Sequence, residues 1–117
     1  MILRQGNWWM EKRKPHYALT KFKKLFSDEK TRIITKTARR GAVPMGYMNE
    51  FDILEITDKL CSDHFVKSMT TYADSTVWQD VYKYKDEDNN LYIKLQLSAD
   101  KKQAVLIQLK EDTGGNE

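Results

Sequence analysis

The sequence predicts an α+β fold in which helices from the first half of the chain pack on a sheet formed by the second half. Residues 18–26 place apolar side chains at the three-and-four spacing of a helix, whereas residues 91–97 alternate apolar and polar side chains, as in a strand with one buried face. Polar segments at 85–90 and 98–103 provide turns between successive strands. Helices followed by a run of hairpins favour this class over a parallel α/β sheet.

Three helical segments are expected before the strands begin. The first covers residues 15–27 and is followed by a short extended piece at 32–34. Thr35 caps a second, brief helix, which Gly41 and Pro44 bring to a stop. The third helix carries an apolar stripe that we expect to be buried, made of Met48, Phe51, Leu54, Thr57, Leu60 and Cys61.

Four strands are expected from residue 65 onward, joined as an antiparallel meander. The first two form a hairpin within FVKSMTTYADSTVWQDVY, residues 65–82, across a turn at 73–76. The third strand covers 91–97 and the fourth covers 104–110. In the fourth strand the side chains expected to be buried are those of Val105, Ile107 and Leu109.

A chain of 117 residues is expected to form a single domain over 1–117, with residues 1–9 as an N-terminal extension and 112–117 as a flexible tail. One cysteine excludes an internal disulfide, and together with two histidines it cannot assemble a Cys/His site for structural zinc. No apolar stretch exceeds four residues, so no transmembrane helix is expected. These features favour a cytoplasmic protein.

The charge is distributed unevenly along the chain. Residues 1–40 hold twelve Lys and Arg against three acidic residues, a net charge of +9, whereas residues 41–117 hold eight basic and fourteen acidic residues, a net charge of −6. Such asymmetry is typical of a polyanion-binding arm attached to a more acidic body. The alternative is that the basic clusters are solvated helix faces.

The motifs of several enzyme classes are absent from the sequence. It lacks G-x-S-x-G, H-E-x-x-H, a glycine-rich phosphate loop and a calcium-binding loop, so neither a metal nor a cofactor is expected. Cys61 is expected to be buried and His64 to have a structural role at the junction between helix and sheet.

The predicted open face of the sheet offers a different chemistry. Lysines, a phenol and amides can bind a phosphodiester, stabilise its extra negative charge in the transition state and transfer a proton without a metal. The alternative is a solvated sheet face without catalytic function. The side chains expected there are Tyr92, Lys94, Gln96, Gln108 and Lys110, with Lys67 and Gln79 as further candidates.

Five segments of the sequence resemble a known family. They are MEKRKPH at 10–16, KSMTTYAD at 67–74, WQDVY at 78–82, LYIKL at 91–95 and LKE at 109–111. In this order and spacing they resemble the MqsR family of bacterial toxins. The resemblance implies an mRNA interferase of a type II toxin–antitoxin system with a RelE-like fold, N-terminal helices packing on a C-terminal antiparallel sheet.

The resemblance also implies the catalytic residues, which by motif are Lys67, Gln79, Tyr92 and Lys110. We expect Lys94, Gln96 and Gln108 to bind the substrate. The resemblance implies cleavage of single-stranded mRNA at GC-containing triplets, chiefly GCU, which would inhibit translation and growth. A second implication is a partner, an MqsA-like antitoxin that joins a zinc domain to a helix-turn-helix domain and would bring the toxin indirectly to operator DNA.

A second hypothesis uses the same face without catalysis. In this interpretation the chain is an RNA- or protein-binding module, and Trp8 and Trp9 beside the basic segment at 12–14 stack on bases.

Overall fold

A computed structural model describes residues 2–3, 10–71 and 73–114 of the chain, and all structural statements concern these residues. The strands form one seven-stranded sheet in the order β1-β2-β4-β5-β6-β7-β3. They are β1 Ile2–Leu3, β2 Met10–Lys12, β3 Arg32–Ile34, β4 Phe65–Thr70, β5 Trp78–Asp86, β6 Asn89–Leu97 and β7 Ala104–Glu111. The helices are α1 Leu19–Phe26, α2 Lys36–Ala42 and α3 Glu50–Lys59, with 3₁₀ turns η1 Val43–Met45 and η2 Ser62–His64.

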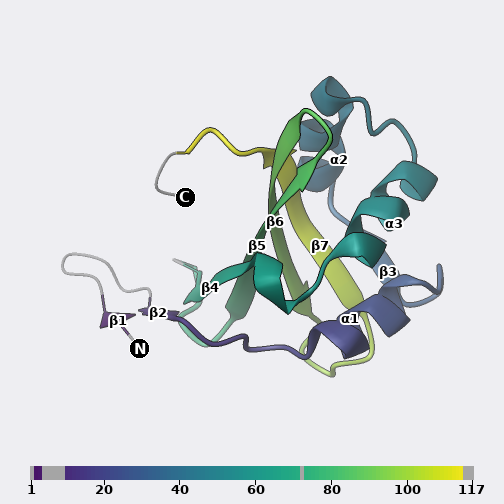
Figure 1. Cartoon of the computed structure of the whole chain (residues 1–117). Coiled ribbons are helices and arrows are strands. Elements are labelled where there is room, and N and C mark those ends of the chain that lie inside the picture. The colour runs from purple at the N-terminus through teal and green to yellow at the C-terminus, as the bar shows by residue number, and fades with distance from the viewer. Residues whose placement is uncertain (1, 4–9, 72, 115–117) are drawn as a thin grey trace.

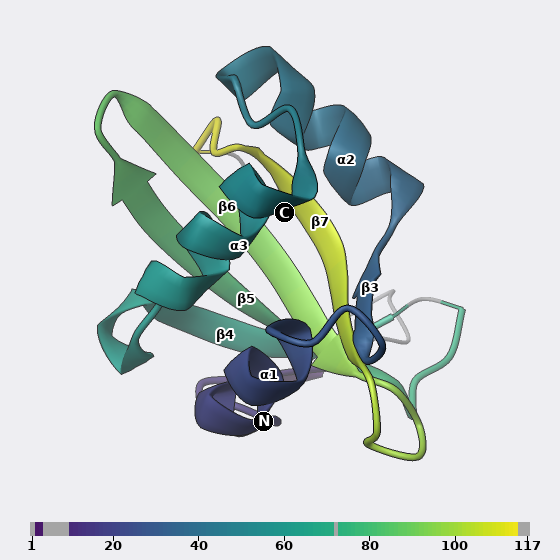
Figure 2. The same ribbon diagram turned by 90° about the vertical axis from the view of Figure 1, so that its right-hand side faces the viewer.

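All three α-helices lie on one side of the sheet (Figure 1), and in the rotated view they stand in front of it (Figure 2). The expected α+β class is therefore confirmed. The strands β4, β5, β6 and β7 are antiparallel neighbours in sequence order, so the meander is confirmed as well.

The strand pairings at the two edges of the sheet were not expected. The strand β3 pairs parallel with β7, with Arg32 opposite Ala104, so the sheet is mixed rather than purely antiparallel. At the other edge β2 pairs with β4, and β1 pairs with β2. The extended piece expected at 32–34 is confirmed as β3. Strands of two or three residues are too short to show a period of two, so sequence patterns do not reveal β1 and β2 or the pairing of β3. Of the expected extension at 1–9, all but Ile2–Leu3 lies outside the described residues.

The core lies between the helices and one face of the sheet. Alternate residues of β6, from Leu91 to Leu97, are at most 4% exposed and share a cluster with Phe22 and Phe26 of α1. Full burial of such a side chain contributes about 1.5–3 kcal/mol to stability. The predicted alternation of β6 is thus what joins the helices to the sheet.

The strand β7 departs from the expected alternation because it contains a β-bulge. Gln108 pairs with Lys94 and Leu106 pairs with Leu95, so Ile107 is an extra residue between them. The expected burial of Val105 and Ile107 is wrong: both are only partly buried, while the fully buried residues of this strand are Ala104, Leu106 and Leu109.

The first helix begins at Leu19 rather than at Pro15. The segment before it is held by a buried carboxylate, because the backbone N–H groups of His16 and Tyr17 donate to Asp80 of β5 at 3.1 and 3.0 Å. The expected cap at the start of the second helix is confirmed, since the side chain of Thr35 accepts a hydrogen bond from the backbone nitrogen of Ala38 at 3.1 Å.

Gly41 lies inside α2 and does not end it, contrary to the expectation. A Cβ atom at this position would overlap the carbonyl oxygen of Leu109 and lie 3.1 Å from the Cβ of Lys110. The glycine therefore allows α2 to approach the backbone of β7 closely. The 3₁₀ turn after the helix ends instead at Gly46, which has a φ of 94°.

The buried face of α3 also differs from the expectation. Phe51 and Met48 are 70% and 67% exposed, whereas Ile53 and Ile56 are each 2% exposed. Thr57 and Leu60 of the predicted stripe are buried, but Cys61 is exposed. The helix carries two apolar stripes, and the contacts that select one of them come from the rest of the fold.

We predict that Gly41→Ala destabilises the protein by about 1–3 kcal/mol, because the added methyl group forces α2 away from β7. An ordinary Gly→Ala change inside a helix would stabilise it by about 0.5–1 kcal/mol. The sign of the change in the free energy of unfolding therefore distinguishes a close approach from an ordinary helical position. Urea-induced unfolding gives the measurement, and Arg40→Ala at the adjacent exposed position is the control. Equal or greater stability of Gly41→Ala would contradict the close approach.

Alkaline pH should destabilise the fold, because burial raises the pKa of Tyr17, Tyr47 and Tyr82 to about 12. The phenol of Tyr47 donates a hydrogen bond to Asp86 at 2.7 Å, and Asp80 contributes to the other two shifts. In the unfolded chain tyrosines lose their protons near pH 10, so the unfolded state binds fewer protons from about pH 10 to about pH 12.

The free energy of unfolding should therefore fall as the pH rises through this window, while the tyrosine contribution is fully present below it. Chemical denaturation at a series of pH values tests this, and Tyr47→Phe should make the decline shallower. A free energy of unfolding that does not change across this window would be evidence against the raised pKa values of these three tyrosines.

Candidate functional site

The sheet face opposite the helices, here called the open face, carries polar side chains from adjacent strands. In the register of β6 and β7, Tyr92 is opposite Lys110 and Lys94 is opposite Gln108. Residues directly opposite one another in an antiparallel pair project from the same face. Gln96 follows Lys94 by two positions on β6 and shares this face, which is the reverse of the face that buries the leucines.

The two residues from the first hairpin lie on the same face. Lys67 of β4 is opposite Val81 of β5, and Val81 is in turn opposite Lys94 of β6. The side-chain amide of Gln79 donates a hydrogen bond to the amide oxygen of Gln96 at 3.0 Å. All seven residues selected from the sequence therefore share the open face: Lys67, Gln79, Tyr92, Lys94, Gln96, Gln108 and Lys110.

The seven residues do not meet at one point. The ammonium nitrogens of Lys110 and Lys94 lie 5.1 and 5.8 Å from the centroid of the Tyr92 ring, within the range of cation–π attraction. Lys67 stands two strands away from Lys94, at roughly 10 Å between backbones. Lys94 is thus the link between the group around Tyr92 and the residues of the hairpin.

Tyr92 is only 1% exposed, although it faces away from the helices. It is not a member of the core cluster, and the ammonium groups of Lys94 and Lys110 lie beside its ring. A phosphate would reach its hydroxyl group once these long, flexible side chains shift toward the negative charge.

Sequence patterns missed charged residues of this face. Lys83 of β5 is opposite Tyr92 of β6, which places it on the open face, and its Nζ lies 3.3 Å from a carboxylate oxygen of Asp112. Glu11 of β2 is opposite Met69 of β4, which places it on the open face, and its carboxylate oxygen Oε1 lies 2.9 Å from Nζ of Lys67. Glu11 is 4% exposed. The segment MEKRKPH contains it, but no periodicity marks a three-residue strand, so only its place in the fold reveals the contact.

The edge of the sheet near the start of β5 carries an aromatic and basic cluster. The ring of His16 stacks on Trp78 with 5.4 Å between centroids, and Nζ of Lys12 lies 4.2 Å from the Trp78 centroid. Burial and the positive charge of Lys12 lower the pKa of His16. Trp78 projects from the face opposite to that of Gln79, so this cluster is separate from the open face.

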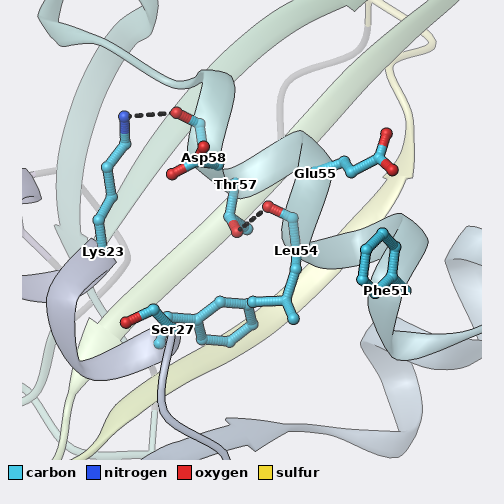
Figure 3. A pocket seen from close by; sticks show the side chains of 8 residues that line it. Lys23, Ser27, Phe51, Leu54, Glu55, Thr57 and Asp58 are labelled. Atoms are coloured by element: carbon cyan, nitrogen blue, oxygen red, sulfur yellow. Dashed lines mark hydrogen bonds between the residues drawn. The ribbon is translucent and has the colours of Figure 1, made fainter.

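The helices form a pocket of about 250 Å³ between α1 and α3 (Figure 3). Phe51 and Leu54 provide apolar walls, and Lys23 donates a hydrogen bond to the carbonyl oxygen of Asp58 across its rim at 2.7 Å. The pocket lies on the helical side of the sheet, whereas the lysine and amide groups lie on the reverse side. It does not contribute to the seven-residue site.

The remaining sequence expectations have separate outcomes. His64 lies in η2 at the junction of helix and sheet, where Nδ1 accepts a hydrogen bond from the backbone of Cys61 at 3.0 Å and the ring contacts Tyr84, so its structural role is confirmed. Trp8 and Trp9 lie outside the described residues.

The structure also bears on metal ligands and membrane spans. Within 2–3, 10–71 and 73–114, no three His, Cys, Asp or Glu side chains gather as ligands for a metal ion. None of the helices in this part of the chain has the length and apolar character needed to span a membrane.

The open face can bind and polarise a phosphodiester. Ammonium groups attract the phosphate charge and stabilise the additional negative charge of a five-coordinate phosphorus. Amides of the glutamine pair offer both donors and acceptors to base or sugar groups. A half-buried setting strengthens each of these interactions relative to water.

Comparison with known proteins identifies relatives of this chain. A family model described as "Motility quorum-sensing regulator, toxin of MqsA" matches residues 14–111. The mRNA interferase toxin MqsR of Escherichia coli (strain K12) is 36% identical over 103 residues, which cover 87% of this chain and 99% of the relative. A family match over most of the chain and a relative matched along almost its whole length identify this protein as a member of the MqsR toxin family.

Proposed function

We propose that this protein is the toxin of a type II toxin–antitoxin system and acts as an endoribonuclease, an mRNA interferase. Family membership supports this function, since the Escherichia coli relative is named as an mRNA interferase toxin. The single structural observation that carries the proposal is the shared open face. Seven side chains selected from four strands in the sequence lie on one side of the sheet, and none of them lies on the helical side.

We assign catalysis to Lys67, Gln79, Tyr92 and Lys110, with Lys94, Gln96 and Gln108 binding the RNA. The 2′-hydroxyl group of the substrate loses its proton and attacks the adjacent phosphorus, and the bond from phosphorus to the 5′-oxygen breaks. The 5′-oxygen takes up a proton, so the products are a 2′,3′-cyclic phosphate and a 5′-hydroxyl end. No metal is required in this scheme, because lysine ammonium groups stabilise the developing charge.

The roles follow from position on the face. Lys110 and Lys94 flank Tyr92, so a phosphate held by these two cations lies beside the phenol that transfers a proton. Gln79 is fixed by its hydrogen bond with Gln96, and this pair orients the substrate. Charge stabilisation therefore contributes more to catalysis than a finely tuned acid and base pair.

The finer features of the proposal rest on the family resemblance. The substrate is single-stranded mRNA cleaved at GC-containing triplets such as GCU, and the consequence in a cytoplasmic setting is inhibition of translation and growth. The partner is an MqsA-like antitoxin with zinc and helix-turn-helix domains. Through that partner the toxin associates indirectly with operator DNA.

We predict that the purified protein cleaves single-stranded RNA containing GCU at an unchanged rate in the presence of EDTA. Tyr92→Phe should lower kcat/KM about 100-fold, since it removes the proton-transferring hydroxyl group. Phenylalanine is used because it retains a ring that is 1% exposed, and an alanine would leave a cavity. Gel analysis of end-labelled RNA gives the rates and identifies the 2′,3′-cyclic phosphate.

Tyr84→Phe is the matched control, since Tyr84 lies on the neighbouring strand β5 and packs against the helical core. It should cleave RNA as the unmodified protein does. RNA that is bound but stays intact at micromolar protein would reject the nuclease in favour of the non-catalytic binding module. Loss of cleavage with EDTA would reject the metal-free scheme alone.

A further inference from the structure

The ion pair between Lys67 and Glu11 is unusual for its burial. The atoms Nζ and Oε1 lie 2.9 Å apart, and the side chains are 16% and 5% exposed. Removing two charges from water costs several kcal/mol each, so a buried ion pair contributes little net stability. Its position beside a residue assigned to catalysis favours a functional explanation.

Two sets of contacts place Glu11 at this point. Its own strand pairs with β4, and the backbone nitrogen of Met10 donates a hydrogen bond to Oγ1 of Thr70 at 2.7 Å. Further along the chain, His16 and Tyr17 are fixed by the carboxylate of Asp80. The N-terminal arm is thus held on both sides of Glu11, and the carboxylate reaches diagonally across β4 to Lys67.

The pairing changes what Lys67 can contribute. Beside a carboxylate its positive charge is compensated, so long-range attraction of the RNA backbone comes mainly from the other lysines of the face. An ammonium group has three N–H donors, and directing one of them to Glu11 restricts the directions of the others. The carboxylate therefore holds the ammonium group of Lys67 in a defined orientation and reduces its general electrostatic attraction for RNA.

We propose that Glu11 is a positioning residue for RNA cleavage, holding the ammonium group of Lys67 in the direction needed at the scissile phosphate. The inference rests on the proposed function. A second role for Glu11, as a base that takes the proton of the 2′-hydroxyl group, would require direct contact with the substrate. The 2.9 Å contact of its carboxylate with Nζ of Lys67 favours action through Lys67 instead.

A double-mutant cycle tests the proposal. Glu11→Gln keeps the shape and one acceptor of the side chain but removes its charge, and it should lower kcat about tenfold, as expected for directly coupled residues. The KM should stay the same or fall, because the open face loses a negative charge. In a Lys67→Met background, Glu11→Gln should change the residual kcat by less than about twofold.

Glu50→Gln is the matched control. It makes the same substitution in a Glu–Arg ion pair, with Arg32, at 3.0 Å on the helical side of the sheet, and should leave kcat and KM unchanged. Equal losses of kcat for Glu11→Gln in both backgrounds would show that Glu11 acts independently of Lys67 and would overturn the proposal. A kcat of Glu11→Gln equal to that of the unmodified protein would also overturn the proposal.

A measurement without RNA separates this inference from the proposed function. In a ¹H–¹⁵N spectrum of lysine ammonium groups, Lys67 should give a slowly exchanging signal that Glu11→Gln weakens and Glu50→Gln does not. If the unmodified protein does not cleave RNA, the proposed function is rejected. Glu11 then has no catalytic role, even if the lysine ammonium signal confirms the ion pair with Lys67.

Glu11→Asp provides a second variant in case Glu11→Gln does not fold. It keeps the negative charge but withdraws the carboxylate by one methylene group, so the ammonium group keeps a counter-ion in a poorer position. Its kcat should fall between those of the unmodified protein and Lys67→Met. A folded Glu11→Asp protein with unchanged kcat would contradict a positioning role.

Discussion

The structure depends on the strict separation of the two faces of β6. Its apolar residues from Leu91 to Leu97 are buried against the helices, and because successive side chains of a strand point in opposite directions, the residues between them must lie on the reverse side. A shift of one residue in pairing would exchange the two sets. The same hydrophobic burial that holds the helices in place therefore presents Tyr92, Lys94 and Gln96 on the open face.

The N-terminal arm extends this polar face beyond the four central strands. It joins the sheet through β2, on the outer side of β4, and is anchored by hydrogen bonds to Thr70 and Asp80. These contacts span about sixty residues of sequence, so closing them costs more chain entropy than the hairpins of the central meander. A negative charge at Glu11 enters the lysine-rich face by this route and compensates Lys67, as Asp112 compensates Lys83.

Much of this fold could be predicted because its signals are local. The alternation of residues 91–97 predicted both faces of β6, and the cap at Thr35 predicted the start of α2. The side of α3 that faces the core could not be predicted, because Phe51 and Ile53 are both apolar and only the packed fold distinguishes them. Gly41 was misjudged for a related reason, since its role depends on a strand almost seventy residues away.

The residues of the candidate site also differ in whether they could be predicted from local sequence patterns. Tyr92 and Lys110 followed from alternation along single strands, whereas Lys67 and Gln79 were ambiguous until the family resemblance selected them. The contact of Glu11 with Lys67 joins residues 56 positions apart through a three-residue strand, and no local pattern indicates it. Residues on long, regular strands can thus be assigned from sequence, but charge pairs between distant segments require the structure.

The central claim is that RNA binds the open face of the sheet, and nuclear magnetic resonance can test it directly. A GCU-containing oligonucleotide with 2′-deoxy sugars cannot be cleaved by attack of a 2′-hydroxyl group, so it can be titrated against ¹⁵N-labelled protein. The account predicts that side-chain and backbone signals of Lys67, Gln79, Lys94 and Lys110 shift together. Shifts confined to the pocket between α1 and α3, with these four residues unchanged, would contradict it.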